Sequence, residues 1–213
     1  VVLEAKGLAK RYGDAVAVAG IDLSVKQSEV IGLLGPNGAG KSSLLRMIAG
    51  ALPCASGGIF WDEADILENG RATHNGRFSF LPADDRDLKL LETAEENLHF
   101  WARLWALADA GAAVSASLKV MGLCAVASAP VRILSAGQKR RLSLARMVMK
   151  QSPLWLMDEP FNALDDAAIG FLSQALSAHL AAGGMAVLAT HHHPDIAGMK
   201  TAYLSAPAPA VAA

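Results

Sequence analysis

An eight-residue segment near the N-terminus has the composition of a phosphate-binding loop. Residues 35–42 read GPNGAGKS and match the pattern G-x-x-x-x-G-K-[ST] in full. Glycines let successive backbone N–H groups converge on a phosphate, and the N-terminus of a following helix adds a positive dipole end. Lys41 supplies a point charge for β- and γ-phosphates, and the Ser42 hydroxyl can coordinate Mg²⁺. We therefore predict a nucleotide site formed by Gly35, Pro36, Asn37, Gly38, Ala39, Gly40, Lys41, Ser42 and Ser43.

A second chemical feature is a pair of acids at the end of an apolar run. Residues 154–159 read LWLMDE, so Asp158 and Glu159 follow four apolar residues. Adjacent carboxylates at the end of a buried strand are unfavourable unless a cation uses their charge. We predict that Asp158 holds Mg²⁺, mostly through water, and that Glu159 positions and deprotonates an attacking water. The alternatives are a glycine turn without a ligand and a surface acidic pair or helix cap, and the presence of both features together argues against them.

The elements that must position these residues alternate between strands and helices. The run 29–34 is apolar after its first residue, as expected for a strand that is buried on both faces. The other strands are predicted over 2–7, 21–26, 57–61, 77–81 at a sheet edge, 153–157 and 185–190. Helices are predicted over 41–51, 92–123, 136–150 and 166–182. This alternation predicts an α/β fold with a mostly parallel core sheet and an inserted helical subdomain over about 85–150.

Composition limits the class of protein. The chain has 213 residues and a net charge of −1, so its length fits one domain and its charge gives no reason to expect a nucleic-acid partner. Although 53% of the residues are hydrophobic, no apolar run approaches the length of a membrane span. The first residues lack the pattern of a signal peptide, and two distant cysteines favour a reducing cytoplasm. We expect one domain over 1–205 and a disordered alanine- and proline-rich tail over 206–213.

A third motif narrows the family. Residues 134–138 read LSAGQ and closely resemble the LSGGQ signature of ABC ATPases, with Ala136 in place of the first glycine. Residues 162–165, NALD, resemble the D-loop of that family, and His191 stands where the family has its switch histidine. Tyr12 stands where the family stacks an aromatic ring on adenine. These elements occur in the family's order across essentially the whole chain, which is similar to an ABC nucleotide-binding domain.

The resemblance implies a fold, a partner and a shared site. The fold is a P-loop NTPase of the ABC type, with an inserted helical subdomain and a small antiparallel β subdomain. The implied assembly is a head-to-tail homodimer in which two ATP molecules, with Mg²⁺, lie at the interface. Each site would join the P-loop of one chain to the partner's copy of Ser135, Ala136, Gly137 and Gln138. His191 would hold the γ-phosphate and the attacking water together with Glu159; a surface histidine is the alternative.

One departure from the family concerns the mouth of the helical subdomain. The family normally has a glutamine there that touches Mg²⁺, and by position it should fall within residues 83–85, which read ADD. No glutamine occurs between Gln27 and Gln138. The prediction is that Asp84 or Asp85 supplies an oxygen ligand to Mg²⁺; the alternative is that the chain couples or hydrolyses weakly.

Three sequence segments resemble one group within that family, the heme exporter ATP-binding protein A family of cytochrome c maturation. They are residues 96–100 (ENLHF), 134–146 (LSAGQKRRLSLAR) and 154–165 (LWLMDEPFNALD). The resemblance implies integral membrane partner subunits of the heme exporter type and a peripheral position on the cytoplasmic face of the bacterial inner membrane. ATP hydrolysis there would drive heme export or the release of heme from its chaperone. Two rivals stay open: an exporter subunit for another cargo, such as a drug, a lipid or a lipoprotein, and a soluble non-transport ABC ATPase.

The remaining aromatic and charged residues are assigned simpler roles. His99 is expected to be a packed or interface residue rather than a heme ligand. Phe100, Trp101 and Trp105 form either core or a groove for a partner's helix. The basic run 139–141, KRR, is interpreted as a solvated helix face.

Overall fold

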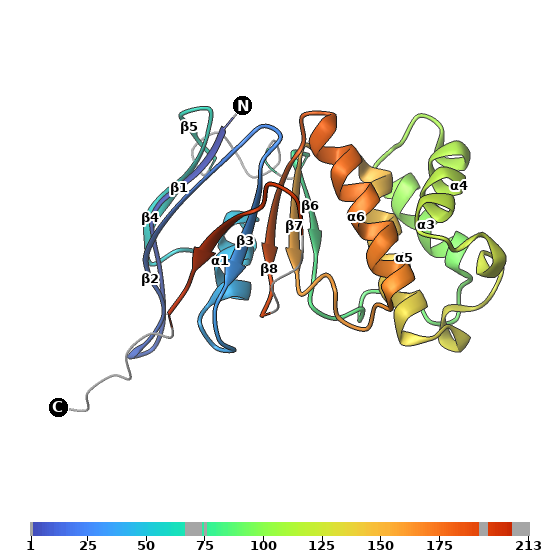
Figure 1. Ribbon diagram of the computed structural model, residues 1–213, viewed down its shortest axis with the longest axis horizontal. Helices are drawn as coiled ribbons and strands as arrows, with labels where there is room; N and C mark the ends of the chain where they lie inside the picture. The colour runs from blue at the N-terminus through green and yellow to red at the C-terminus, as the bar shows by residue number, and fades with distance from the viewer. Residues whose placement is uncertain (1, 67–73, 75, 192–195, 206–213) are drawn as a thin grey trace.

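A parallel sheet of five strands forms the centre of the structure, a computed structural model that describes residues 2–66, 74, 76–191 and 196–205 (Figure 1). The strand order is β6-β7-β8-β3-β9, and all neighbouring strands are parallel. The strands are β3 (Val30–Leu34), β6 (Phe78–Leu81), β7 (Leu154–Asp158), β8 (Met185–Ala189) and β9 (Lys200–Tyr203). Every residue of β3, β7 and β8 is buried. Continuous apolar runs therefore suit these strands, because other elements cover both faces of the sheet.

An antiparallel sheet lies beside the core sheet, with helix α1 packed between the two (Figure 1). Its strand order is β2-β1-β4-β5. The elements are β1 (Val2–Tyr12), β2 (Ala15–Lys26), β4 (Ser56–Trp61), β5 (Ala64–Asp65) and α1 (Lys41–Ile48). Apolar side chains of α1 share one buried cluster with β1, β2, β7 and β8. The helix that follows the glycine-rich loop is therefore held from both sides.

The other side of the core sheet carries the longer helices (Figure 1). They are α3 (Ala94–Leu104), α4 (Ala110–Val120), α5 (Ala136–Lys150) and α6 (Asp166–Ala181), and short 3₁₀ turns cover Cys124–Val126 and Val131–Ile133. Two of the helices begin at capping boxes, Thr93 with Glu96 and Ser135 with Gln138. In each box the two residues satisfy one another's backbone N–H group, which fixes where the helix starts.

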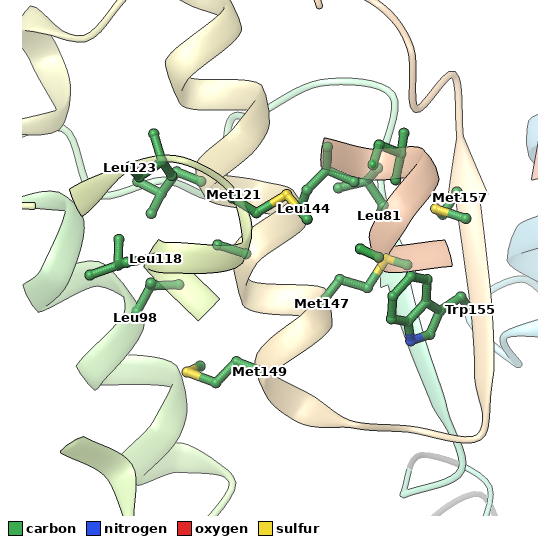
Figure 2. Close-up of a cluster of buried hydrophobic side chains, with 14 of the residues drawn as sticks. Leu81, Leu98, Leu118, Met121, Leu123, Leu144, Met147, Met149, Trp155 and Met157 are labelled. Atoms are coloured by element: carbon green, nitrogen blue, oxygen red, sulfur yellow. The ribbon is translucent and has the colours of Figure 1, made fainter. Parts of the chain in front are cut away.

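Helix α5 is packed on both sides. Figure 2 shows Met147 of α5 pointing toward Trp155 of β7, while Leu144 lies near Met121 at the end of α4. All four side chains are 4% exposed or less and belong to one buried cluster. Because packed side chains transmit displacement, α5 links the helical region mechanically to the strand that ends in Asp158.

The structure confirms the predicted fold class and corrects several elements. The antiparallel strands predicted over 2–7 and 21–26 are longer, at 2–12 and 15–26. The helical block predicted over 92–123 is two helices, separated at residues 105–109, where Ala106 has a φ of 51°. β9 was not predicted at all, whereas β6 does lie at a sheet edge.

Some predictions stay untested. The domain limits stay predictions, and the tail 206–213 lies outside the described residues. His192 and His193 also lie outside them. Among the helices of the described residues, none is both long and apolar enough to cross a membrane.

Candidate active site

The loop between β3 and α1 is fixed by contacts that only glycine permits. Gly35 and Gly40 have φ values of 147° and 90°. A Cβ atom at Gly40 would lie 2.2 Å from the carbonyl oxygen of Ala17 in β2, and one at Gly35 would lie 2.2 Å from that of Leu204. Both positions therefore require glycine for backbone conformation and for space. The loop is held between β2 and the residue after β9.

Lys41 folds back over this loop. Its Nζ donates hydrogen bonds to the carbonyl oxygens of Gly35, at 2.7 Å, and Pro36, at 3.1 Å. The lysine is 6% exposed, whereas residues 36–38 are exposed. The structure thus places a buried cation under a loop whose outer surface is open, as binding of a phosphate chain requires.

Ser42 and Asp158 meet across two elements. Ser42 Oγ in the first turn of α1 donates to Asp158 Oδ1 at the end of β7, at 2.9 Å. Asp158 Oδ2 is buried and has no hydrogen-bond partner within the part of the chain that the structure describes. Burial is the main cause that raises the pKa of the Asp158 carboxyl. An unsatisfied buried carboxylate oxygen beside a hydroxyl suits a hard divalent cation, so both residues fit Mg²⁺.

Glu159 and His191 also meet at the carboxyl ends of neighbouring strands. His191 Nδ1 lies 2.9 Å from Glu159 Oε2, and because a carboxylate only accepts, the proton of this bond lies on Nδ1. The Glu159 backbone has a φ of 48°, and its N–H donates to the Ala189 carbonyl oxygen of β8 at 2.8 Å. A non-glycine residue in the left-handed region costs about 1–3 kcal/mol when its surroundings impose it. A constrained backbone therefore fixes the direction in which the Glu159 side chain leaves the end of β7.

The two acids after β6 have other partners in the structure. Asp85 Oδ1 lies 3.3 Å from Arg140 Nη1. Asp84 Oδ2 lies 3.1 Å from Arg86 Nε, and both of these side chains are more than half exposed. Ligation of Mg²⁺ by Asp84 or Asp85 stays a prediction.

The structure contradicts the interpretation of residues 139–141 as a solvated face. Arg140 is only 2% exposed, while its two neighbours are half-buried. The helical spacing carried a signal that was missed, since Arg140 stands three and seven residues before Ser143 and Met147, which are buried on the inner face of α5. Arg140 therefore belongs to the surroundings of the site.

Residues 135–138 form the start of α5. Ser135 and Gln138 close the capping box, and Ser135 and Ala136 are exposed. A Cβ atom at Gly137 would lie 2.8 Å from the Ala163 carbonyl oxygen. Figure 1 shows this end of α5 at the same lower edge as the loop between β3 and α1. The backbone of these residues is thus presented to the surface at the edge that carries the site.

Tyr12 lies at the turn of the β1–β2 hairpin. It pairs with Ala15 and is 54% exposed, and Lys10 Nζ lies 5.3 Å from its ring centroid. Within one chain, direct contacts bring together a smaller set than the sequence predicted. That set is Gly35, Pro36, Lys41, Ser42, Asp158, Glu159 and His191.

Comparison with known proteins decides the family. Residues 18–162 match the family model described as ABC transporter. The chain belongs to this family of ATP-binding proteins. It is 45% identical over 202 residues to the "Cytochrome c biogenesis ATP-binding export protein CcmA" of Paramagnetospirillum magneticum. The matched region covers 94% of this chain and 92% of that protein. The protein of the same name from Rhodospirillum rubrum is 41% identical over 204 residues, covering 94% and 85%.

A solved structure agrees with this assignment. The "Structure of ATP binding subunit of ABC transporter" superposes with a TM-score of 0.81 at 28% sequence identity. The match covers 90% of this chain and 80% of that one. As an ABC ATPase, the chain binds ATP.

Replacing Lys41 with Ala removes the buried cation of the loop. Loss of charge-assisted bonds to phosphate costs about 1.5–3 kcal/mol, so ATP should bind roughly tenfold to 100-fold more weakly. Hydrolysis should fall by about 100-fold or more. Nucleotide titration and phosphate release measure both effects, with Lys119→Ala on the exposed end of α4 as the control. Normal turnover by Lys41→Ala would contradict the assignment of the loop.

Replacing Glu159 with Gln keeps the shape of the side chain and removes the base. ATP should bind as in the parent protein, hydrolysis should fall by about 10²–10⁴-fold, and an ATP-bound dimer should accumulate. Size-exclusion chromatography with ATP and Mg²⁺ detects that dimer. If the variant hydrolyses ATP at the parental rate, another group activates the water.

The Mg²⁺ dependence of hydrolysis tests Asp84 and Asp85 separately. If either carboxylate ligates the ion, changing that residue to Ala should raise the Mg²⁺ concentration for half-maximal activity, about tenfold for a lost ligand. Gln at the same position should partly preserve the parental value. Unchanged metal dependence in both Ala variants would leave Mg²⁺ to Ser42, Asp158, phosphate and water.

Proposed function

We propose that this chain is the ATP-hydrolysing subunit of a membrane ABC complex that acts in cytochrome c maturation. The observation that carries the proposal is similarity over nearly the full length to proteins named for cytochrome c biogenesis and export. The cargo step that we propose is heme export, in the sense of releasing heme from its chaperone. In this role the chain supplies energy, and its membrane partners handle the heme.

The proposed mechanism assigns each side chain of the site one task. The loop's N–H groups and Lys41 bind the phosphates of ATP, and the exposed ring of Tyr12 stacks on the adenine. Ser42 and Asp158 would hold Mg²⁺, which when bound would neutralise negative charge on the phosphates.

Glu159 and His191 activate the attacking water in this mechanism. Glu159 accepts the proton of the attacking water, because its carboxylate is fixed at the open end of β7. His191 donates to Glu159 through Nδ1, and this bond would hold the imidazole ring and the carboxylate together beside the γ-phosphate. The pair is therefore suited to direct the water as well as to deprotonate it.

We propose that two copies of the chain assemble head to tail. The exposed start of α5 has the positive end of a helix dipole and backbone donors at Ala136 and Gly137. The Ser135 N–H is used by Gln138, but the Ser135 hydroxyl accepts from Gln138 and keeps its own proton to donate. In a dimer these groups, with Gln138 fixing the turn, would face the γ-phosphate bound by the partner subunit. ATP would then join the two copies, and hydrolysis would release them.

The membrane partner is proposed to dock beside the aromatic cluster of α3. A groove of about 650 Å³ lies between the helical region and β6. Trp101 and Trp105, whose ring centroids are 5.4 Å apart, line it while packing on the core. These residues pack on the core, and their role as a groove for a partner's helix is part of this proposal. We place the protein peripherally on the cytoplasmic face of the bacterial inner membrane, bound to integral subunits of the heme exporter type and to no nucleic acid.

His99 is not proposed as a heme ligand. Its Nε2 lies 3.7 Å from Glu95 Oε1 on the preceding turn of α3. Together with Phe100, Arg103 and Leu104 it borders a surface hollow, so its simpler role is local pairing on the helix surface.

A catalytically inactive chain tests the proposed pathway. In a host that depends on this protein, Glu159→Gln should leave association with the membrane partners intact and abolish production of holocytochrome c. Heme should accumulate on the upstream chaperone, because its release requires hydrolysis rather than docking. Heme staining of c-type cytochromes reads the loss, and spectra of b-type cytochromes serve as the unaffected control.

The cargo assignment can fail without the family assignment. If c-type cytochromes mature normally while drug resistance or lipoprotein localisation is lost, the complex exports another cargo. A cell with defects only in DNA repair or translation would instead favour the soluble class of ABC ATPase.

A further inference from the structure

The guanidinium of Arg140 connects three segments that meet behind the site. Its Nη1 donates to the Pro82 carbonyl oxygen at 2.7 Å and to Asp85 Oδ1 at 3.3 Å. Its Nη2 donates to the carbonyl oxygens of Asp158, at 2.7 Å, and Glu159, at 2.8 Å. One side chain of α5 therefore binds the loop after β6 and the end of β7 at once.

The charge of Arg140 is compensated mainly by Asp85, with smaller contributions from Asp158 and Glu159. Burial is the main cause that lowers the pKa of the guanidinium, and the nearby Asp85 carboxylate is the first cause that opposes it. Asp85 belongs to the same loop as the Pro82 carbonyl, so the loop supplies both the counter-charge and a neutral acceptor. A buried charge with one partner removed is strongly unfavourable. Arg140 is thus oriented by the loop 82–85.

Arg140 Nη2 binds the backbone around Glu159, which has an unfavourable conformation. The carbonyl groups of Asp158 and Glu159 flank the left-handed backbone of Glu159. Such a conformation persists only where its surroundings determine it. The surroundings here are Arg140 together with the Glu159 N–H bond to Ala189 and the Asn162 N–H bond to Glu159. A fixed carbonyl pair also fixes the direction in which the Glu159 side chain leaves the strand.

We propose that Arg140 is a positioning residue that makes ATP hydrolysis depend on the placement of the loop 82–85. Held by Asp85, it keeps the Asp158–Glu159 backbone in the conformation that aims the Glu159 carboxylate at His191 and the nucleotide. Displacement of the loop, or of α5, withdraws the guanidinium and lets Glu159 turn away. The start of α5 lies only about 6 Å along the helix from Arg140, so movement of either the start of α5 or Arg140 reaches the carboxylate. This inference rests on the proposed role of Glu159 in activating water.

Lysine substitution at two adjacent arginines provides a matched test in the full chain. Arg140→Lys keeps the charge but cannot span four acceptors with a planar fork. Arg141→Lys is the control, because Arg141 on the same helix also donates to two backbone carbonyls, those of Met121 and Gly122, away from the site. Steady-state hydrolysis, binding of a fluorescent ATP analogue and thermal unfolding are measured for both variants.

We expect Arg140→Lys to lower kcat and to leave ATP binding nearly unchanged. Since a small misplacement of a reacting group costs on the order of 10- to 100-fold, kcat of Arg140→Lys should fall by that factor while ATP affinity stays within about twofold. Arg141→Lys should retain parental kcat. Asp85→Ala should lower kcat at an unchanged Mg²⁺ requirement, and should add little in the Arg140→Lys background, because the two residues act as one unit.

Several outcomes would overturn the inference. They are parental kcat in Arg140→Lys, equal losses in both lysine variants, and a raised Mg²⁺ requirement in Asp85→Ala alone. If Arg140→Lys does not fold, Asp85→Ala decides, since full activity in that variant excludes orientation by the loop. Failure of the function itself is distinct: Glu159→Gln would then retain hydrolysis, whereas failure of this inference leaves Glu159→Gln inactive.

Discussion

Burial of the carboxylate at the end of β7 is the constraint around which the site is arranged. Asp158 is 1% exposed, and an isolated charge there would cost several kcal/mol. The chain meets this cost from two sides, with the Ser42 hydroxyl in front and the Arg140 guanidinium on the backbone behind. Oδ2 is left without a partner among the described residues, and a bound cation would satisfy it. The loop, α1 and α5 must all meet at this strand end for the arrangement to exist.

Helix α5 packs on the strand that ends in Asp158, and it also carries an exposed N-terminus. α5 begins at an exposed capping box and continues past the buried Arg140 to Met147, which points toward Trp155 of β7. Close packing makes this segment act as a rigid body, since interiors at this density transmit displacement rather than absorb it. The part of the chain suited to contact a partner's nucleotide is therefore joined, through Arg140 and Met147, to the part that holds its own.

Features encoded in short contiguous segments could be predicted from the sequence, and features made by distant contacts could not. The loop 35–42, the acids Asp158 and Glu159 at the end of β7 and the parallel sheet follow from local composition and from apolar runs. β9 was missed because its residues are exposed or half-buried and lack the apolar run of a buried strand; it forms only by pairing with β3. The burial of Arg140 could have been predicted from the helical spacing of α5, but its acceptors could not, because they lie 18 and 58 residues away. The functions of Asp84 and Asp85 were open for the same reason, since the sequence cannot show that an arginine 55 residues away lies beside Asp85.

The signature motif departs from the family pattern at Ala136, and the surroundings of the start of α5 explain why the fold accepts this residue. Ala136 is exposed at the start of α5, so its methyl group is compatible with the fold of the chain that carries it. Gly137 differs, because a Cβ there would press on the Ala163 carbonyl of the same chain at 2.8 Å. Folding therefore constrains the second small residue of the motif, while the first is constrained only by what docks against it. In the proposed dimer that surface is the partner's nucleotide, so residue 136 can change the approach of the γ-phosphate without changing the stability of its own domain.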